Sequence, residues 1–214
     1  MKHFYHGLFG SPKDWDCIVS DGPEIMIHDL YQEKTTDILS LKTGPEDILV
    51  GYSMGGRIAI EIARKNQFNL SKLLLLSTHP GLSEGEKEER IKWEDSVLDK
   101  MHSMTAEAFK KFWDGLDLFQ SSQMDQQLSE TKLRDSARLF KELRLSKMPL
   151  CLEQLIQNKS KVTWVLGQHD SKYITMLAEK VRTSGIETLI VETDHRVLRD
   201  KTAIKNLFSI KGIL

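Results

Sequence analysis

A serine flanked by glycines is the residue of this chain best placed to do chemistry. Residues 51–55 read Gly-Tyr-Ser-Met-Gly, after an apolar run at 47–50 and before a helix-like stretch at 56–65. This is the G-x-S-x-G pattern between a strand and a helix, where a tight turn exposes the serine hydroxyl. The glycines leave room for the turn, because a Cβ there would strike the neighbouring strand or helix. The alternative interpretation of Ser53 is an incidental serine in a glycine-rich turn.

A serine nucleophile needs a base, and the base needs an acid that orients it. In a strand–turn–helix context of this kind, the order along the chain is serine, then an acid, then histidine. Asp170 follows one expected strand and His195 follows the next, so both should lie at the sheet edge that carries Ser53. His169 and Asp194 compete for these roles, but each is one place off the expected loop position. A helix cap for Asp170 and a surface position for His195 are the alternatives.

An oxyanion formed at this serine would need two backbone N–H donors. The N–H of Met54, directly after the serine, is the first candidate. The loop His6–Ser11 reads His-Gly-Leu-Phe-Gly-Ser and matches an H-G-x-x-G pattern, so we expect the Phe9 N–H to be the second donor. His6 is better interpreted as a residue that ties this loop than as a base.

The elements that position these residues follow from hydrophobic patterning. Strands that alternate with helices indicate an α/β fold with a mostly parallel sheet flanked by helices. The apolar run at 72–76 is typical of a strand covered on both faces. The expected strands are 3–5, 24–28, 47–50, 72–76, 161–166 and 187–191. The expected helices outside the central insertion are 15–19, 38–42, 56–65, 172–182 and 201–208.

The stretch from about 84 to 157 differs from its surroundings. It is charged, rich in Lys, Glu, Met and Leu, and has no clear strand. It predicts a helical cap inserted between two sheet strands and lying over Ser53 as a lid. A plain helical elaboration is the alternative. With 214 residues, a single domain over 1–214 is expected.

Composition narrows the classes of function. The 30 basic and 31 acidic residues leave no large basic face for nucleic acid and no polybasic tail for an anionic membrane. The first residues lack the apolar core of a signal peptide, and no apolar run is long enough to insert across a membrane. Cys17 and Cys151 lie far apart, outside metal-ligand spacing, and favour a reduced, cytoplasmic setting. We expect neither metal nor organic cofactor, and the sequence does not predict the oligomeric state.

Over nearly all of its length the chain resembles the α/β-hydrolase superfamily. Within it, the chain resembles the menaquinone-pathway family of 2-succinyl-6-hydroxy-2,4-cyclohexadiene-1-carboxylate synthases. The resemblance implies the α/β-hydrolase fold with a helical cap. It is carried by residues 51–57, 77–82, 112–119 and 167–173, which are similar to the family's G-Y-S-[LM]-G-G-R, S-x-x-P-G-L, aromatic-then-PLF and G-E-x-D-x-K-[FY] segments.

The resemblance also implies an unusual reaction for such a serine. The Ser–His pair removes a proton from a succinyl-bearing cyclohexene, pyruvate is expelled, and the oxyanion donors hold enolate-type charge. The substrate carries several carboxylates, which cationic side chains must meet. Arg57 matches the family's arginine four residues after the serine, with a helix-surface charge as its alternative. Arg90 roughly matches a cap arginine, where a solvated helix charge is equally open, and a third arginine corresponds to Arg134 or Arg144.

Two aromatic residues are further candidates for substrate contact. Trp113 lines the pocket or packs in the cap core, and Tyr52 donates its hydroxyl to a carboxylate or merely packs. The chain also departs from the family. The segment 194–201 lacks the glycine, second histidine and proline usual around the histidine, and Asp117 stands where the family has proline. The sheet lacks the first two strands common in the superfamily, and these departures bear on the substrate.

Three functions remain open from the sequence. The favoured one is the pyruvate-eliminating lyase step, with Ser53 as nucleophile or proton-transfer partner, His195 as base and Asp170 as the orienting acid. The second is a serine hydrolase acting on a small carboxylic ester, thioester or C–C bond. In both, the partner is a small-molecule carboxylate or ester. The third is a non-catalytic ligand-binding protein, in which the acid and the histidine would not point at the serine.

Overall fold

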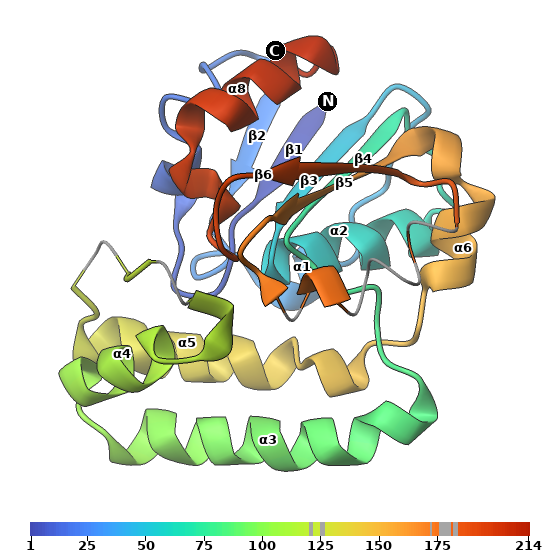
Figure 1. Cartoon of the computed structure of the whole chain (residues 1–214). Coiled ribbons are helices and arrows are strands. Elements are labelled where there is room, and N and C mark those ends of the chain that lie inside the picture. Colours follow the sequence, from blue (N-terminus) through green and yellow to red (C-terminus); the bar gives the residue numbers. More distant parts are fainter. Residues whose placement is uncertain (120–121, 125–126, 172, 176–180, 182–183) are drawn as a thin grey trace.

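A six-stranded parallel sheet runs through the described part of the chain, in the order β2-β1-β3-β4-β5-β6 (Figure 1). The computed structural model describes residues 1–119, 122–124, 127–171, 173–175, 181 and 184–214. The predicted strands are confirmed, with ends that move by one or two residues. They are β1 (Lys2–Tyr5), β2 (Ile25–His28), β3 (Ile48–Tyr52), β4 (Lys72–Leu76), β5 (Val162–Gly167) and β6 (Glu187–Val191).

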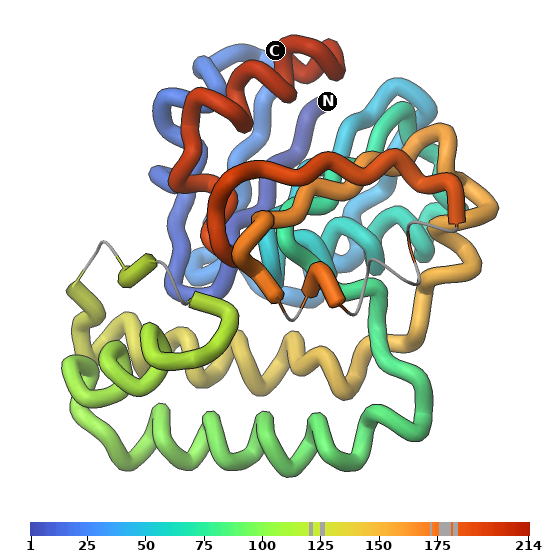
Figure 2. The backbone as a smooth tube through the Cα atoms, in the orientation of Figure 1, coloured from blue at the N-terminus to red at the C-terminus, as the bar shows by residue number. Residues whose placement is uncertain are grey.

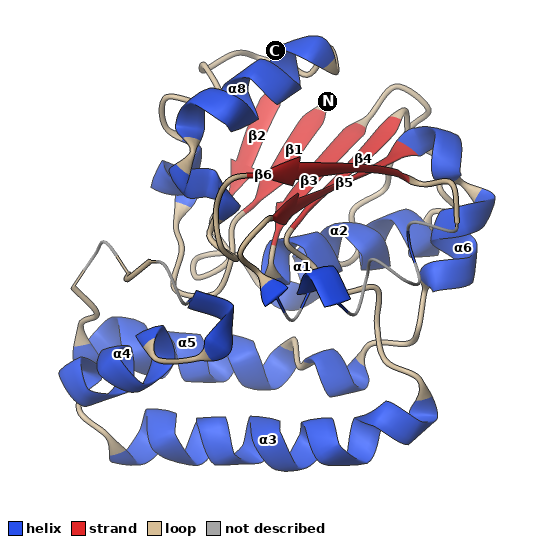
Figure 3. Cartoon of the chain, viewed as in Figure 1, coloured by secondary structure: helices blue, strands red, loops and turns tan. Residues whose placement is uncertain are grey.

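Helices cover both faces of the sheet and one of its edges (Figure 3). The α-helices are α1 (Thr35–Ile38), α2 (Met54–Lys65), α3 (Glu84–Ser103), α4 (Ala106–Asp114), α5 (Glu130–Glu142), α6 (Leu152–Gln157) and α8 (Lys201–Ile210). Short 3-10 helices are η1 (Pro12–Trp15), η2 (Asp117–Phe119), η3 (Leu145–Lys147), η4 (Lys159–Lys161) and η5 (Val197–Arg199). The helices predicted at 56–65 and 201–208 are confirmed. Of the helix predicted at 172–182, residues 173–175 and 181 are helical and the others lie outside the described residues.

Two predicted helices are wrong. At 15–19, the 3-10 helix η1 ends where the helix was expected to begin, and Cys17 takes a φ of 64° that a continuing helix does not allow. At 38–42, helix α1 has already ended, and the Ser40 hydroxyl donates to the Asp37 carbonyl at 2.8 Å. A serine that bonds the local backbone in this way competes with helix propagation.

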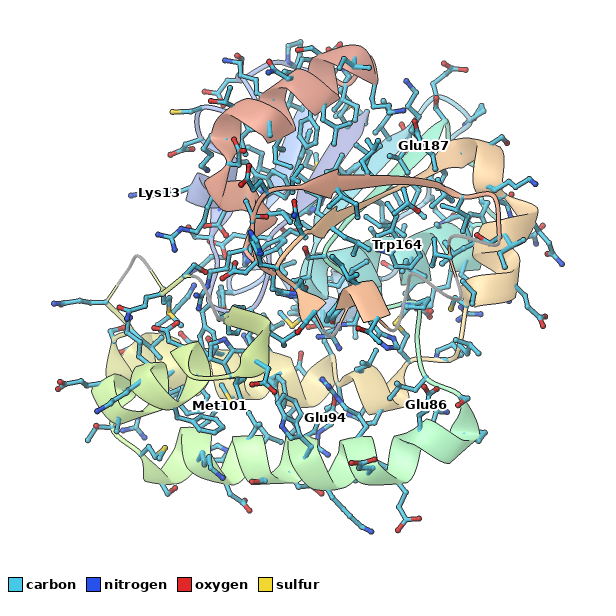
Figure 4. All side chains as sticks on the ribbon, viewed as in Figure 1. Lys13, Glu86, Glu94, Met101, Trp164 and Glu187 are labelled. Atoms are coloured by element: carbon cyan, nitrogen blue, oxygen red, sulfur yellow. The ribbon has the colours of Figure 1, made fainter. Side chains whose placement is uncertain are left out.

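Alternate residues of each central strand enter separate hydrophobic clusters on the two faces of the sheet. One cluster lies under α2 and the other under α8. Both faces are therefore covered, which explains why these strands read as continuous apolar runs. Trp164, fully buried, lies at the centre of the first cluster (Figure 4). The strand residues are Leu49, Leu73, Leu75 and Trp164 in the first cluster, and Phe4, Val50, Leu74, Leu76 and Val165 in the second.

Helices α3, α4 and α5 form a separate layer, which we call the cap, beside the edge where the strands end (Figure 1). Both termini lie at the opposite end of the molecule (Figure 2). The cap has its own hydrophobic cluster, whereas α6 places Leu155 in the cluster under α2. Leu139 of α5 lies in the cluster under α2 as well, so α5 links the cap to the core. The cap cluster includes Val97, Met101, Phe109, Trp113, Leu133 and Phe140.

Two histidines on or next to β1 should make the stability of the fold depend on pH. Burial lowers the pKa of His3 and that of His6 from 6.5 to about 4, because desolvation disfavours their charged forms. Below about pH 6.5 the unfolded chain therefore binds more protons than the folded chain, so stability is full above this value and is lost as the pH falls towards 4. We expect the urea midpoint, followed by circular dichroism, to fall between about pH 7 and about pH 5.

The matched variants are His3→Gln and His102→Gln, the latter at an exposed position of α3. The first should flatten the dependence of the urea midpoint on pH, and the second should leave it as in the wild type. A wild-type midpoint that stays constant over this range would contradict the prediction.

Candidate active site

The turn that carries Ser53 is held in an unusual backbone conformation. Ser53 has a φ of 53° and a ψ of −111°, a region that residues with a Cβ rarely adopt. Its N–H donates to the Leu76 carbonyl at 2.8 Å, and its carbonyl accepts the Thr78 hydroxyl at 2.6 Å. Both partners belong to the end of β4 or to the residues directly after it. Strand β4 and the residues directly after it therefore hold both the N–H group and the carbonyl group of Ser53.

The glycines around this turn are required by close backbone approach, as predicted for positions 51 and 55. A Cβ on Gly51 would lie 2.5 Å from the Gly56 Cα, and a Cβ on Gly55 would lie 2.5 Å from the carbonyl carbon of Tyr5. Gly56 is a third such position, because its Cβ would lie 2.5 Å from that of Thr78. Strand β1, strand β3 and helix α2 thus approach one another more closely than any side chain would permit.

The side chains of Ser53, His195 and Asp170 form a continuous hydrogen-bonded chain. Ser53 Oγ lies 3.0 Å from His195 Nε2, and His195 Nδ1 lies 2.6 Å from Asp170 Oδ2. The three residues follow β3, β6 and β5, and the acid and the imidazole are buried. The Asp170 carboxylate accepts a hydrogen bond from the Nδ1–H group of His195, which places the imidazole proton on Nδ1. The unprotonated Nε2 can therefore accept a hydrogen bond, and later the proton, from the serine hydroxyl. Such an arrangement can activate the hydroxyl as a nucleophile or take a proton from a bound substrate.

Residues that compete for these positions lie elsewhere. The His169 side chain is exposed, and Asp194 accepts the N–H of Arg196 at 2.9 Å and the hydroxyl of Ser122. Asp170 also caps a following helical turn, since its Oδ1 accepts the Tyr173 N–H at 3.2 Å. The structure therefore brings Asp170, and neither neighbour, to the imidazole.

Two cavities meet at Ser53 and His195. The first, of about 490 Å³, extends under the cap and is lined by Arg57 and Arg90; we call it the arginine cavity. The second cavity, of about 420 Å³, extends between the loop after β1 and the segment before α8. The serine thus has space on two sides for different parts of a substrate. Leu8, Trp113 and Phe119 line both cavities, and Arg196, Arg199 and Lys201 are the cations of the second.

Arg57 is a half-buried cation of the arginine cavity. Its Nη1–H donates to the Leu143 carbonyl at 2.7 Å, and no carboxylate among the residues that the structure describes forms an ion pair with it. Desolvation, with a smaller contribution from the nearby charge of Arg90, lowers the pKa of Arg57 to about 10. The side chain is still charged at neutral pH. Because a partly desolvated charge without an acidic partner is unfavourable, Arg57 is suited to contact an anion. Two carboxylates, those of Glu86 and Glu89, also line the cavity.

Arg90 reaches the same cavity from the cap helix α3. Its guanidinium carbon lies 4.4 Å from the ring centroid of Trp93, and its Nε–H donates to Glu94 at 2.8 Å. Glu94, fully buried on α3 (Figure 4), also accepts the Leu145 N–H at 2.9 Å and the Ser146 hydroxyl at 2.5 Å. The carboxylate is therefore fixed by three donors, and it fixes the arginine in turn.

The other predicted contact residues take different positions. Arg134 is exposed on α5, and Arg144 pairs with Asp95 at 2.7 Å; neither lines the two cavities. Trp113 lines both cavities and also packs in the cap cluster, so its two proposed roles coexist. Tyr52 lines the second cavity, and burial raises the pKa of its hydroxyl.

The expectation that the Phe9 N–H is an oxyanion donor is wrong. This N–H donates to the Tyr31 hydroxyl oxygen at 2.9 Å, and the residue has a φ of 64°. In the described part of the chain, the N–H groups of Leu8 and Met54 form no hydrogen bond, and both residues line the arginine cavity with Ser53. The H-G-x-x-G pattern does not show whether the amide of its third residue, Leu8, or that of its fourth, Phe9, faces the site. This depends on the backbone conformation of Phe9, whose φ is positive here.

Three cavity residues were missed as site residues. The centroids of the Tyr173 and His195 rings lie 4.8 Å apart. The His79 ring packs edge-on against the Tyr173 ring, with centroids 6.1 Å apart. Trp93 lines the same cavity. A signal was present for two of them, because His79 and Tyr173 lie in segments that carry the family resemblance and follow strands at the same sheet edge. Trp93 gave no signal beyond its position three residues after Arg90.

Neither a membrane-spanning helix nor a metal cluster is found among the described residues. None of the helices there is both long enough and apolar enough to cross a membrane. In the same residues, His, Cys, Asp and Glu side chains do not gather in threes or more in a way that would hold a metal ion.

Comparison with known proteins places this geometry beside named enzymes. No family model matches the chain. A stretch of 76 residues, 35% of the chain, is 42% identical to a Bacillus subtilis protein named as a candidate 2-succinyl-6-hydroxy-2,4-cyclohexadiene-1-carboxylate synthase, and it spans only 28% of that protein. A Haemophilus influenzae protein of the same name is 24% identical, over 82% of the chain and 83% of the relative.

Solved structures agree on the fold. MenH from S. aureus superimposes with a TM-score of 0.74 at 19% identity, over 99% of this chain and 91% of that one. The carboxylesterase CesB from Bacillus subtilis gives a TM-score of 0.63 at 16% identity, over 99% and 84%. The enol-lactonase from Burkholderia xenovorans gives 0.63 at 13%, over 99% and 90%. The chain has the α/β-hydrolase fold, and its sequence resembles the two named synthases.

The close approach at Gly55 should make this position intolerant of any side chain. We expect Gly55→Ala to lower the urea midpoint strongly or to prevent folding, because the new Cβ would overlap the β1 backbone. The matched control is Gly85→Ala in the first turn of α3, where a Cβ would meet nothing within 4 Å. That control should match or exceed wild-type stability, since alanine favours a helix by up to about 1 kcal/mol over glycine. Equal stability of the two variants would contradict the proposed packing.

Proposed function

We propose that this α/β-hydrolase-fold chain is an enzyme that eliminates pyruvate to form 2-succinyl-6-hydroxy-2,4-cyclohexadiene-1-carboxylate. The observation that carries the proposal is a shared cavity. The hydrogen-bonded pair Ser53–His195 opens into the cavity that holds Arg57, a half-buried cation without a carboxylate partner among the described residues. A proton acceptor beside an unpaired guanidinium is the arrangement that a carboxylate substrate undergoing proton removal requires.

In this mechanism His195 takes the proton and the backbone stabilises the charge. Nε2 accepts the ring proton through the Ser53 hydroxyl, and Asp170 stabilises the imidazolium that results. The C–H electron pair forms the new ring double bond, and the bond from the ring to the enolpyruvyl oxygen breaks. The leaving enolate takes one proton at carbon and becomes pyruvate, and the His195 imidazolium gives up the proton that it gained, either to the enolate or to water. Enolate-type charge on the succinyl carbonyl oxygen is met by the N–H groups of Met54 and Leu8.

The arginines account for substrate binding in this proposal. The product named above carries a ring carboxylate and a succinyl carboxylate, and two cations line the cavity beside the serine. Arg57 and Arg90 are assigned one carboxylate each. Arginine suits this role because its planar fork binds a carboxylate through two hydrogen bonds.

A serine hydrolase is the second candidate, and the second cavity favours it. That cavity gives the serine room for a leaving group on the side away from Arg57 and Arg90. Ser53 would then attack an ester, thioester or activated C–C carbonyl, and the same N–H pair would hold the tetrahedral oxyanion. A non-catalytic binding protein is less well supported, because it predicts an imidazole turned away from the serine. The cytoplasmic setting, the single domain and the absence of a cofactor stay predictions.

Removing the serine hydroxyl should abolish turnover. We expect Ser53→Ala to lower the rate of pyruvate release by at least ~10³-fold, as for loss of a member of a catalytic triad. Pyruvate is measured continuously with lactate dehydrogenase and NADH. The control is His169→Gln, an exposed neighbour of the acid, which should keep the wild-type rate. A wild-type rate in Ser53→Ala would exclude this mechanism.

Removing the unpaired cation should separate the two candidate reactions. We expect Arg57→Met to raise KM for the tricarboxylate-type substrate by about 10-fold or more, because a charge-assisted hydrogen bond contributes about 1.5–3 kcal/mol. Cleavage of p-nitrophenyl acetate, which carries no carboxylate, should change little. Arg134→Met, at an exposed position of α5, is the control. Wild-type KM in Arg57→Met, or rapid ester cleavage without any pyruvate release, would favour the hydrolase.

A further inference from the structure

We propose that Tyr31 is a positioning residue that holds the loop of residues 7–10, called here the oxyanion loop, and ties its geometry to the cap helix α5. The proposal rests on the proposed function in one respect: the loop supplies the Leu8 N–H that would face a developing oxyanion. The evidence is a set of hydrogen bonds that reach the loop from two elements distant in sequence.

The oxyanion loop needs support from outside itself. The Gly10 N–H donates to the Gly7 carbonyl at 3.1 Å, which closes a turn, and Phe9 within that turn has a φ of 64°. A residue with a Cβ is strained in this region, and such strain persists only where the surroundings hold it. The Phe9 N–H would also be left without an acceptor, because Phe9 is 8% exposed.

Tyr31 meets both requirements with one hydroxyl group. Its oxygen accepts the Phe9 N–H at 2.9 Å and lies 3.0 Å from Ser136 Oγ on α5. Ser136 is fully buried, so a water molecule from the solvent cannot replace this contact. Burial also raises the pKa of Tyr31 to about 12, which keeps the hydroxyl protonated. The hydroxyl is therefore a bridge between the middle of the loop and the cap.

Lys132, one turn before Ser136 on α5, holds the end of the loop. Its Nζ–H donates to the Gly10 carbonyl at 2.8 Å, and Nζ lies 3.3 Å from the ring centroid of Tyr31. Desolvation lowers the pKa of Lys132, as expected for an ammonium enclosed between a ring and the loop. Cation–π contact of this kind is strengthened where water is excluded.

His6 holds the start of the loop from the sheet side. Its Nδ1 lies 2.8 Å from the Gly7 carbonyl and its Nε2 accepts the Leu30 N–H at 3.1 Å, which assigns the proton to Nδ1. The His6 ring stacks on the Tyr31 ring with centroids 5.6 Å apart. Leu8 therefore lies between His6, which holds the start of the loop, and the contacts that hold its middle and its end. Ser136, through Tyr31, and Lys132 supply those contacts from α5. The oxyanion loop keeps its geometry only while α5 is docked.

The test removes the bridge atom by atom. Tyr31→Phe deletes the hydroxyl and keeps the ring, Ser136→Ala deletes its contact on α5, and Lys132→Met removes the bond to Gly10. The matched control for the last is Lys141→Met, at an exposed position of the same helix. Amide hydrogen exchange of residues 8–10 and steady-state pyruvate release are measured for each folded variant.

We expect exchange at positions 9 and 10 to be at least ~10-fold faster in the three variants, with exchange in β3 and β4 unchanged and the control at the wild-type value. We also expect kcat to fall by about 10-fold or more with KM within about 2-fold, because a displaced oxyanion donor weakens binding of the transition state and spares that of the substrate. A purely structural tyrosine would lower the urea midpoint and leave kcat of the folded protein unchanged.

Two results would overturn the proposal. The first is wild-type exchange of residues 8–10 in Tyr31→Phe, and the second is faster exchange there with wild-type kcat. Failure of the proposed function gives a different result, namely no pyruvate release by the wild-type protein. In that case the exchange measurement, which needs no substrate, still decides whether Tyr31 and α5 hold the loop.

Discussion

The backbone conformation of Ser53 is the constraint on which the rest of this structure depends. A φ of 53° with a ψ of −111° costs of the order of 1–3 kcal/mol for a residue with a side chain. It occurs where β1, β3 and α2 approach closely enough to leave no room for a Cβ at positions 51 and 55, and where Thr78, after β4, leaves none at position 56. That same approach brings the end of β1, and hence the oxyanion loop, beside the serine. The strained turn and the loop that would serve it are two results of one packing arrangement.

The parallel sheet then gathers the remaining groups. All strands end at the same edge, so the loops after β3, β5 and β6 meet there although Ser53 and His195 are 142 residues apart in the chain. The cap and the 3-10 helix η2 that follows α4 complete the enclosure and form hydrogen bonds with it. The His195 N–H donates to the Leu118 carbonyl in η2, and Lys132 and Ser136 on α5 contact the oxyanion loop and Tyr31. The cap is therefore part of the geometry of the site as well as its cover.

How far the sequence predicts this arrangement depends on whether a feature is set locally. The strands follow from apolar runs, and the placement of Asp170 and His195 follows from the rule that parallel strands end together. The helix expected at 15–19 fails because Cys17 adopts a positive φ that no local pattern announces. The choice of Leu8 over Phe9 as oxyanion donor fails for a related reason. It depends on a hydrogen bond from Phe9 to Tyr31, whose hydroxyl is in turn held by Ser136, 105 residues further on. The arginine contacts depend on how each cap helix is rotated, which the charge pattern of an exposed helix does not reveal.

The arginines of this region differ in whether a carboxylate of the protein pairs with them. Arg144 is paired with Asp95 outside the two cavities at the serine, whereas Arg90 is held through its Nε by Glu94 and still lines the arginine cavity. Arg57 has a carbonyl oxygen as acceptor and no acidic partner in the described chain. Partial burial of a guanidinium without an acidic partner is unfavourable, because the charge loses part of its hydration. An anion that enters the arginine cavity supplies the opposite charge that the described residues do not. Arg57 therefore lowers the stability of the fold but favours binding of a carboxylate beside Ser53, where the proposed reaction removes a proton.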